Sequence, residues 1–167
     1  MHRAVLRALD RFAKNSELLA LVDRPGLERL STCGSIEHRE ADEVVVRQGD
    51  VDGQTFYLIV AGSLAVWVQG EQGDGIRQAA TLTGGHFFGE IGTLTRQPRS
   101  ATVRTLTPVE LIAFPREPVL AVLSEYPAVK EIIGSVGLAR TEENLRGDGM
   151  SEIMVGGLAE ALEGPDE

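Results

Sequence analysis

A glutamate and an arginine lie nine residues apart in a glycine-rich segment, 84–101, and together they could bind a small anion. Arg99 carries a planar fork of donors that matches two phosphate oxygens and stays charged at any physiological pH. Glu90 would repel a phosphate, yet a carboxylate beside a phosphate site can accept hydrogen bonds from sugar hydroxyls. The pair therefore suits a ligand in which a sugar carries one phosphate.

The residues around this pair fit the same ligand. Gly89 lets the backbone come close to a bound group, and 89–92 is expected to form the first turn of a very short helix, whose free amides suit a phosphate. A loop of this length inside a compact barrel is usually functional. Ser100 offers a hydroxyl and Ala101 leaves space. The predicted ligand-binding residues are Phe88, Gly89, Glu90, Ile91, Gly92, Arg99, Ser100 and Ala101.

Hydrophobic periodicity predicts the elements that position this loop. Apolar residues in 1–34 recur at helical spacing, which predicts an N-terminal helical segment. From 35 to 116 the pattern changes to alternation and short β-rich runs between turn signals, which predicts a β-roll that contains the loop. The helical period returns over 117–146 as hinge and lid helices, and the acidic end, 147–167, is expected to be a flexible tail.

Turn signals separate the β-rich runs, and two of the runs are interpreted as a pair. The runs 56–60 and 64–68 flank a short turn signal, as two antiparallel strands joined by a tight turn would. The runs 101–106 and 109–114 flank another turn, and 69–75 is a polar hairpin tip. The predicted fold class is α+β and mainly β: an antiparallel β-roll or jelly-roll barrel with N-terminal helices and a C-terminal helical lid.

The last helical stretch contains two glycines that lower its stability as a helix. Gly134 and Gly137 each destabilise a helix by roughly 1 kcal/mol relative to alanine, so this helix could move. The charged residues near its end, Arg140 among them, are interpreted as a solvated helix face. The alternative is that Arg140 or Thr141 reaches a bound purine when the helix closes.

Composition excludes several classes of function. The formal net charge is −9, which disfavours nucleic acid as a direct partner, because that binding needs several basic residues on one face. Cys33 is the single cysteine, which fits a reducing compartment. Without a long apolar run, the protein is expected to be cytoplasmic and to make no membrane contact. The three histidines lack metal-ligand spacing and no activated nucleophile is visible, so neither enzymatic activity nor a cofactor is expected.

Two sequence segments carry a resemblance to a known family. The segment FGEIGTLTRQPRSATVRT, residues 88–105, resembles the phosphate-binding cassette of the cyclic-nucleotide-binding domain family. The run RQGDVDGQTFYLIVAGSLAVW is similar to the family's upstream pattern, with Gly49 and Gly62 where the family keeps turn glycines. The resemblance covers roughly residues 36–146.

The resemblance implies a role for each cassette residue. Glu90 would accept a hydrogen bond from the ribose 2′-hydroxyl, and Arg99 would bind the cyclic phosphate with the amides of 89–92 and Ala101. The family often has Thr after the arginine where cGMP is preferred, and Ala or Ser where cAMP is, so Ser100 favours cAMP. The cassette spacing resembles kinase regulatory subunits and nucleotide-gated channels more than the catabolite activator proteins, and no helix-turn-helix of the required length follows.

The predicted function is therefore a non-enzymatic sensor of cAMP, with cGMP less favoured, that signals through movement of its C-terminal helix. Its partners would be the cyclic nucleotide and a protein, either another copy of the chain or an effector. The alternative is a nucleotide-independent interaction protein, in which the β-roll is a scaffold that has lost ligand binding.

Overall fold

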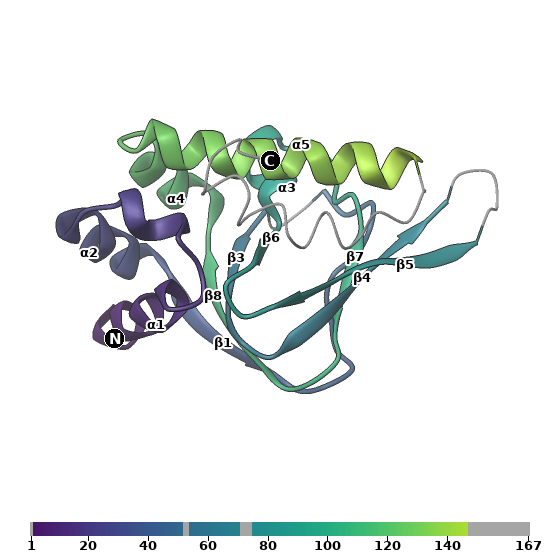
Figure 1. Cartoon of the computed structure of the whole chain (residues 1–167), viewed down its shortest axis with the longest axis horizontal. Helices are drawn as coiled ribbons and strands as arrows, with labels where there is room; N and C mark the ends of the chain where they lie inside the picture. The colour runs from purple at the N-terminus through teal and green to yellow at the C-terminus, as the bar shows by residue number, and fades with distance from the viewer. Residues whose placement is uncertain (1, 52–53, 71–74, 147–167) are drawn as a thin grey trace.

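We describe the fold from a computed structural model of the chain, which covers residues 2–51, 54–70 and 75–146. Helices lie at both ends of this part of the chain, and the strands between them form two antiparallel sheets (Figure 1). This arrangement confirms the predicted α+β class, a β-roll between N-terminal and C-terminal helices. The prediction of a flexible tail at 147–167 lies outside the described residues.

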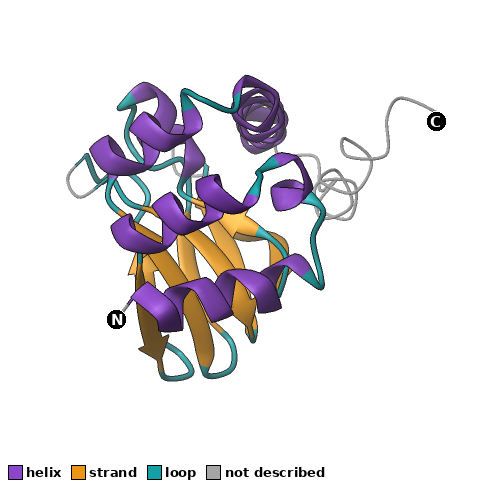
Figure 2. Cartoon of the chain, turned by 90° about the vertical axis from the view of Figure 1, so that its left-hand side faces the viewer, coloured by secondary structure: helices purple, strands orange, loops and turns teal. Residues whose placement is uncertain are grey.

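The N-terminal helices form a layer across one face of the strands (Figure 2). Helix α1 turns one side toward the core, where Leu9 and Phe12 are at most 1% exposed. Asp23 caps α2 by accepting a hydrogen bond of 3.0 Å from the backbone N–H of Gly26. The helices are α1 (His2–Ala13), the 3₁₀ helix η1 (Leu18–Leu21) and α2 (Arg24–Cys33).

The strands form two four-stranded sheets with the orders β1-β8-β3-β6 and β2-β7-β4-β5 among the described residues. All of the strand pairs are antiparallel. The strands are β1 (Ser35–Arg39), β2 (Val44–Val46), β3 (Phe56–Ala61), β4 (Ser63–Gln69), β5 (Ile76–Thr83), β6 (Phe87–Phe88), β7 (Thr102–Thr105) and β8 (Val109–Phe114).

The prediction that the runs 56–60 and 64–68 pair with each other is wrong. β3 pairs with β6 and β8, whereas β4 pairs with β5 and β7, so β3 and β4 belong to different sheets. β7 and β8 are separated in the same way. Both turns carry the chain from one sheet to the other. The strands on either side of the expected hairpin tip do pair, because Gln69 at the end of β4 lies opposite Ile76 at the start of β5.

The core follows from the apolar character of β3 on both faces. Phe56, Leu58 and Val60 face the N-terminal and C-terminal helices in one apolar cluster. Tyr57 and Ile59 point to the opposite side, into a second cluster between the two sheets. The alternation of side chains along one strand therefore joins the helical layer to the interior of the roll.

Gly62, between β3 and β4, should tolerate no side chain. Its φ is +99°, and a Cβ there would lie 2.5 Å from the carbonyl oxygen of Pro108. We expect Gly62→Ala to lower the free energy of unfolding by about 2–5 kcal/mol, the sum of left-handed strain and a backbone clash. Gly49 is the matched control, since its φ is +93° but nothing lies within 4 Å of a Cβ. Urea denaturation of Gly49→Ala should show a loss of only about 1–2 kcal/mol in the free energy of unfolding. Equal losses in the two variants would contradict the steric argument.

An ion pair between α1 and β8 should make the fold sensitive to acid. Arg11 donates two hydrogen bonds to the carboxylate of Glu110, at 2.6 and 2.9 Å, and they hold the pKa of Glu110 below its ordinary value of 4.5. A lowered folded-state pKa gives stability that is present above about pH 4.5 and lost as the pH falls through the folded value.

We therefore expect Glu110→Gln to flatten the loss of stability below about pH 4.5, as followed by thermal melts at several pH values. Glu28→Gln, which removes the charge of a side chain that is 62% exposed, is the control and should leave the profile unchanged. A profile of Glu110→Gln that matches the parent protein would contradict the assignment.

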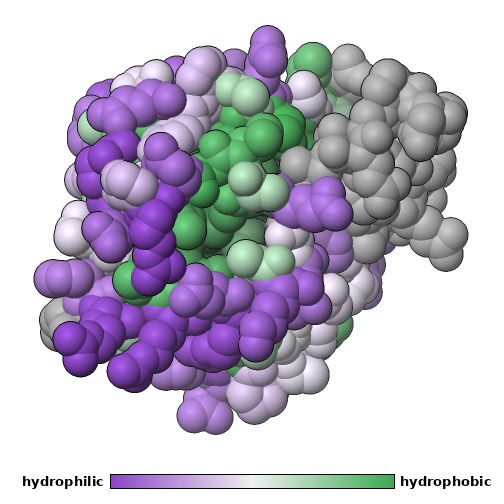
Figure 3. Space-filling view, turned by 60° about the vertical axis from the view of Figure 1, so that its left-hand side comes forward, coloured by the Kyte–Doolittle hydropathy of each residue, from purple (hydrophilic) through white to green (hydrophobic). Residues whose placement is uncertain are grey.

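The C-terminal helices complete the described fold. α4 (Arg116–Leu123) and α5 (Pro127–Arg146) follow β8, and α5 runs along the edge of the roll beside α3 (Figure 1). Among the residues that the structure covers, no helix is long and apolar enough to span a lipid bilayer. Apolar side chains reach the surface on the side that comes forward in Figure 3, where polar residues surround them.

Candidate ligand-binding site

The segment 84–101 contains a short strand and a short helix as well as loops. Phe87 and Phe88 pair with Leu58 and Tyr57 of β3, so the segment that was predicted as a loop also contains a two-residue strand. The apolar pair is buried in the core, and it anchors the segment to the first sheet. Helix α3 (Glu90–Thr95) begins directly afterwards, which confirms the expected short helix.

Gly89 precedes α3 in the left-handed conformation, with φ at +87°. A Cβ at this position would lie 2.5 Å from the carbonyl oxygen of Thr55 and 2.8 Å from Nη1 of Arg99. The glycine is therefore required twice, by its backbone angle and by the close approach of its neighbours. Helix α3 begins directly after this glycine, and the first amides of a helix have no acceptor within the helix. They can therefore donate to a bound anion.

Arg99 is buried, with 6% of its surface exposed. Its guanidinium donates to the carbonyl oxygens of Gly89 at 3.1 Å and Thr55 at 3.0 Å. Burial lowers the pKa of Arg99, while the neighbouring Tyr57 and Glu90 act against this shift. A cation that is desolvated among uncharged carbonyls is well suited to attract an anionic ligand.

Glu90 is buried at 3% exposure and pairs with a residue from the far end of the described chain. Nη1 of Arg140, on α5, donates to Oε1 of Glu90 at 2.9 Å. Both side chains of this ion pair are shielded, with 15% of Arg140 and 4% of Glu90 exposed. The Arg140 guanidinium also lies 5.0 Å from the centroid of the Phe87 ring, a cation–π distance.

The charged groups line one cavity that is partly open to solvent. Seven of the eight predicted residues line it: Phe88, Gly89, Glu90, Gly92, Arg99, Ser100 and Ala101. The side chain of Ile91 is outside the description.

The remaining wall comes from residues that were not predicted as site residues. Arg140 lines the cavity, so its interpretation as part of a solvated face is wrong, and the alternative that it reaches the site describes its position better. The other six residues are apolar and come from strands β2, β4, β5 and β7: Val46, Val66, Ala79, Ala80, Leu82 and Val103. Their alternation along the strands is the signal that could have found them.

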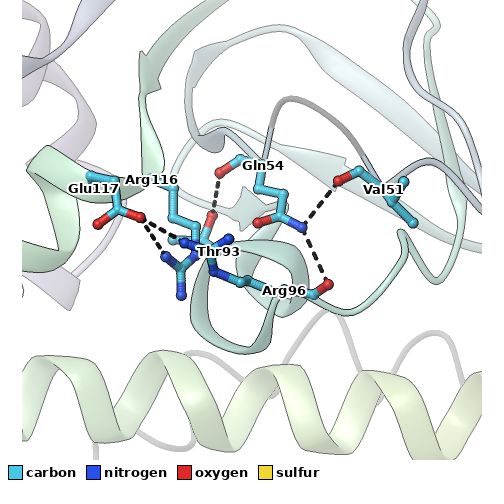
Figure 4. A network of polar contacts seen from close by, with 6 residues as sticks. All are labelled: Val51, Gln54, Thr93, Arg96, Arg116 and Glu117. Carbon is cyan, nitrogen blue, oxygen red and sulfur yellow. Dashed lines mark hydrogen bonds and ion pairs between the residues drawn. The ribbon is translucent and has the colours of Figure 1, made fainter.

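A polar network holds α3 in place (Figure 4). The hydroxyl of Thr93 donates to the carbonyl of Gln54 at 3.2 Å, and Nε2 of Gln54 donates to the carbonyl of Arg96 at 3.2 Å. The side chain of Arg96 in turn donates to Glu117 of α4 at 3.0 Å, and Arg116 donates to the same oxygen at 2.8 Å. The helix that begins at Glu90 is thus tied to the loop before β3 and to α4.

A metal centre has no support in the part of the chain that the structure describes. It contains no group of three or more His, Cys, Asp or Glu side chains that could hold an ion. The cavity instead combines two arginines, Arg99 and Arg140, with one buried carboxylate and an apolar wall, which suits an organic anion with hydroxyl groups.

Comparison with protein families gives one match. The family model described as cyclic nucleotide-binding domain matches residues 36–126, which is more than half of the chain. Among curated proteins, the mouse (Mus musculus) cyclic nucleotide-gated channel alpha-4 is 35% identical over 57% of this chain and 17% of its own length. The cAMP-dependent protein kinase regulatory subunit of Dictyostelium discoideum is 32% identical over 65% of this chain and 33% of its own length.

Solved structures give the same fold. The regulatory domain of Toxoplasma gondii PKA, crystallised with cAMP, superposes with a TM-score of 0.70 at 20% identity, over 78% of this chain and 48% of that one. The Thermus thermophilus catabolite activator protein superposes with a TM-score of 0.63 at 26% identity, over 75% of this chain and 57% of that one. The chain thus spans less than two thirds of the length of each of these relatives.

Proposed function

The chain belongs to the cyclic nucleotide-binding domain family, and we propose that it is a non-catalytic sensor that binds cAMP in preference to cGMP. The observation that carries this proposal is the meeting of Arg99 and Glu90 in one cavity with an apolar wall. A cyclic nucleotide has three matching parts, namely a singly charged phosphate, a ribose with one free hydroxyl and an apolar-faced purine.

We propose that each part of the ligand meets a different part of the cavity. The Arg99 guanidinium, with the amides at the start of α3, would hold the cyclic phosphate. The Glu90 carboxylate has lone pairs left beside its bond from Arg140 and would accept a hydrogen bond from the ribose 2′-hydroxyl. The purine would lie against the apolar residues of the second sheet, among them Val66 and Leu82. Each role agrees with the resemblance of the cassette to its family.

Helix α5 would serve as the lid. Arg140 lines the cavity and contacts Glu90, so its side chain stands where a nucleotide would meet the helix. Movement of this helix would change the surface of the domain when nucleotide binds. We propose that a partner protein, a second copy or an effector domain responds to this change.

The preference for cAMP depends on Ser100. Its side chain lines the cavity next to Arg99, and the family often has Ser or Ala at this position where cAMP is preferred. The described side chains at the apolar wall offer no other hydrogen bond to a guanine. The preference for cAMP is therefore proposed from the resemblance to the family, because the hydroxyl of serine, like that of threonine, can accept a hydrogen bond from the 2-amino group of guanine.

Titration calorimetry with cAMP, cGMP and 5′-AMP tests the proposal. We expect one site per chain, tightest binding for cAMP, and weak binding for 5′-AMP, whose open phosphate has a different charge and shape. Tighter binding of cGMP would contradict the preference for cAMP. An absence of heat with all three, together with a stable oligomer in light scattering, would support the nucleotide-independent scaffold instead.

A further inference from the structure

We infer that the outer face of helix α1 is a docking surface for the acidic segment 160–167 of the same chain. This surface lies outside the nucleotide cavity, since no residue of α1 lines that cavity, and the inference does not depend on the proposed function. Two observations carry it. One is a row of cations on an exposed helix face, and the other is an acidic segment that is tethered within reach of this row.

The outer face of α1 carries basic side chains at helical spacing. Three arginines recur at every fourth position, and a lysine follows directly after the last helical residue. Positions three or four apart are neighbours on one side of a helix. Figure 2 shows α1 lying with its other side on the strands, so this row faces solvent. The row, which we call the basic face, consists of the exposed residues Arg3, Arg7, Arg11 and Lys14.

The rest of the described chain neutralises little of the basic face. Arg11 pairs with Glu110, but Arg3, Arg7 and Lys14 form no ion pair within residues 2–51, 54–70 and 75–146. Asp10, the acidic residue of α1, lies 3.8 Å from Arg24 of α2. Such a concentration of positive charge stands out in a chain with 16 basic and 25 acidic residues. The basic face therefore attracts anions locally, although the chain as a whole is acidic.

The chemistry of α1 decides between the anions that could bind there. A helix that binds a lipid surface inserts its apolar side, and in α1 that side is buried in the core by Leu9 and Phe12. A free polyanion such as nucleic acid meets the long-range repulsion of a net charge of −9. A tethered anionic segment is present at an effective concentration on the order of millimolar. Exposed ion pairs are individually weak, so the tether favours a segment of the same chain.

The chain contains a segment with the required charge. Half of the residues in 160–167 are acidic, and the whole of 147–167 contains no lysine or arginine. The segment therefore has no positive charge of its own that would compete with the basic face. Its four carboxylates equal the four cations of α1 in number: Glu160, Glu163, Asp166 and Glu167.

The linker 147–160 is long enough to bring this segment to α1. Its residues span up to about 46 Å when extended, whereas the 20 residues of α5 measure about 30 Å. Helix α5 contacts η1, and η1 contacts α1. The linker can therefore run back along the whole of α5 and still reach the basic face. Once docked, the acidic segment would cover this face and compete with any other anion for it.

Carbodiimide cross-linking of the full chain without nucleotide tests the inference. The reagent joins a lysine amine to a carboxylate in direct contact, and Lys14 and Lys130 are the only lysines of the chain. We expect Lys14 to link to 160–167 at least about fivefold more than Lys130 does, because docking raises the local concentration of carboxylates. Lys130 is the built-in control, since it is exposed on α5 beside Glu131. Raising the salt concentration from about 0.05 to about 0.5 M should lower the Lys14 product about threefold by screening.

Two double variants separate the basic face from net charge. Arg3→Gln with Arg7→Gln keeps Lys14 in place and should lower its cross-link to 160–167 about threefold, because two of the four cations are lost. Arg47→Gln with Arg104→Gln changes the net charge equally at exposed positions outside α1 and should leave the yield unchanged.

A mixture of unlabelled and isotopically labelled chains identifies the occupant. Docking within one chain gives cross-linked peptides that carry a single label. Peptides with both labels would show a second copy on the basic face and would overturn the inference. Equal yields at Lys14 and Lys130, or an absence of the Lys14 product, would overturn it as well. Because the measurement needs no ligand, a failure to bind cAMP would contradict the proposed function and leave this result standing.

Discussion

Replacing Arg99 with alanine should weaken cAMP binding by about 10- to 150-fold, the range expected for loss of a charged hydrogen bond. The effect should be large because Arg99 is 6% exposed, which makes it the more deeply buried of the two arginines, Arg99 and Arg140, that line the cavity. Arg99→Lys keeps the charge but loses the two-pronged geometry, so we expect intermediate binding. Calorimetric titration at constant salt measures all three proteins.

Folding and charge need their own controls in this experiment. Arg99→Ala also removes the Arg99 donor from the carbonyl of Thr55, which should cost about 1–3 kcal/mol of stability, whereas the carbonyl of Gly89 keeps its hydrogen bonds from Thr93. A urea denaturation curve must therefore show that the variant is folded under the titration conditions. Arg104→Ala removes a cation that is 48% exposed on β7 and should bind like the parent protein. Unchanged binding by a folded Arg99→Ala would refute the proposed site.

Removing Arg140 should be the more damaging change for the protein without ligand. Arg140→Met leaves the Glu90 carboxylate, which is 4% exposed, without its counter-charge. Breaking a buried ion pair in this way costs about 3–5 kcal/mol, and the partial exposure of Arg140 places our expectation near the lower value. Lys130→Met, at an exposed position of the same helix, is the control and should change stability by at most about 0.5 kcal/mol.

A double-mutant cycle separates the ion pair from other losses. Glu90→Gln in the Arg140→Met background removes the uncompensated charge, so the double variant should be more stable than the sum of the two single losses predicts. We expect a coupling of at least ~1 kcal/mol in urea denaturation at pH 7. Additive losses would contradict the ion pair as a source of stability.

The sequence was sufficient to predict most of the fold class and the charged centre of the site. Alternation and turn signals locate strands, and the spacing of Glu90 and Arg99 around a short helix is a local property. The pairing of β3 with β4 was predicted wrongly because a turn signal does not say which sheet the next strand joins. That choice is made by long-range packing, here by β8 lying against β3 and β7 against β4.

The other half of the site could not be predicted for the same physical reason. Arg140 lies 50 residues from Glu90, in a stretch whose charges are typical of an exposed helix face. Only the position of α5 across the roll brings its guanidinium to the carboxylate. Val46, Val66 and Leu82 come from three separate strands, and their common wall exists only after the sheet β2-β7-β4-β5 has formed.

The two main-chain carbonyls that hold Arg99 also affect the thermodynamics of recognition. An arginine side chain that is free in solution loses rotamer freedom when a ligand fixes it, at about 0.5–1.5 kcal/mol for each immobilised side chain. The carbonyls of Gly89 and Thr55 already restrain the guanidinium at 3.1 and 3.0 Å. That entropy is lost when the protein folds, so a phosphate meets a preorganised donor and less of its binding enthalpy is offset by ordering.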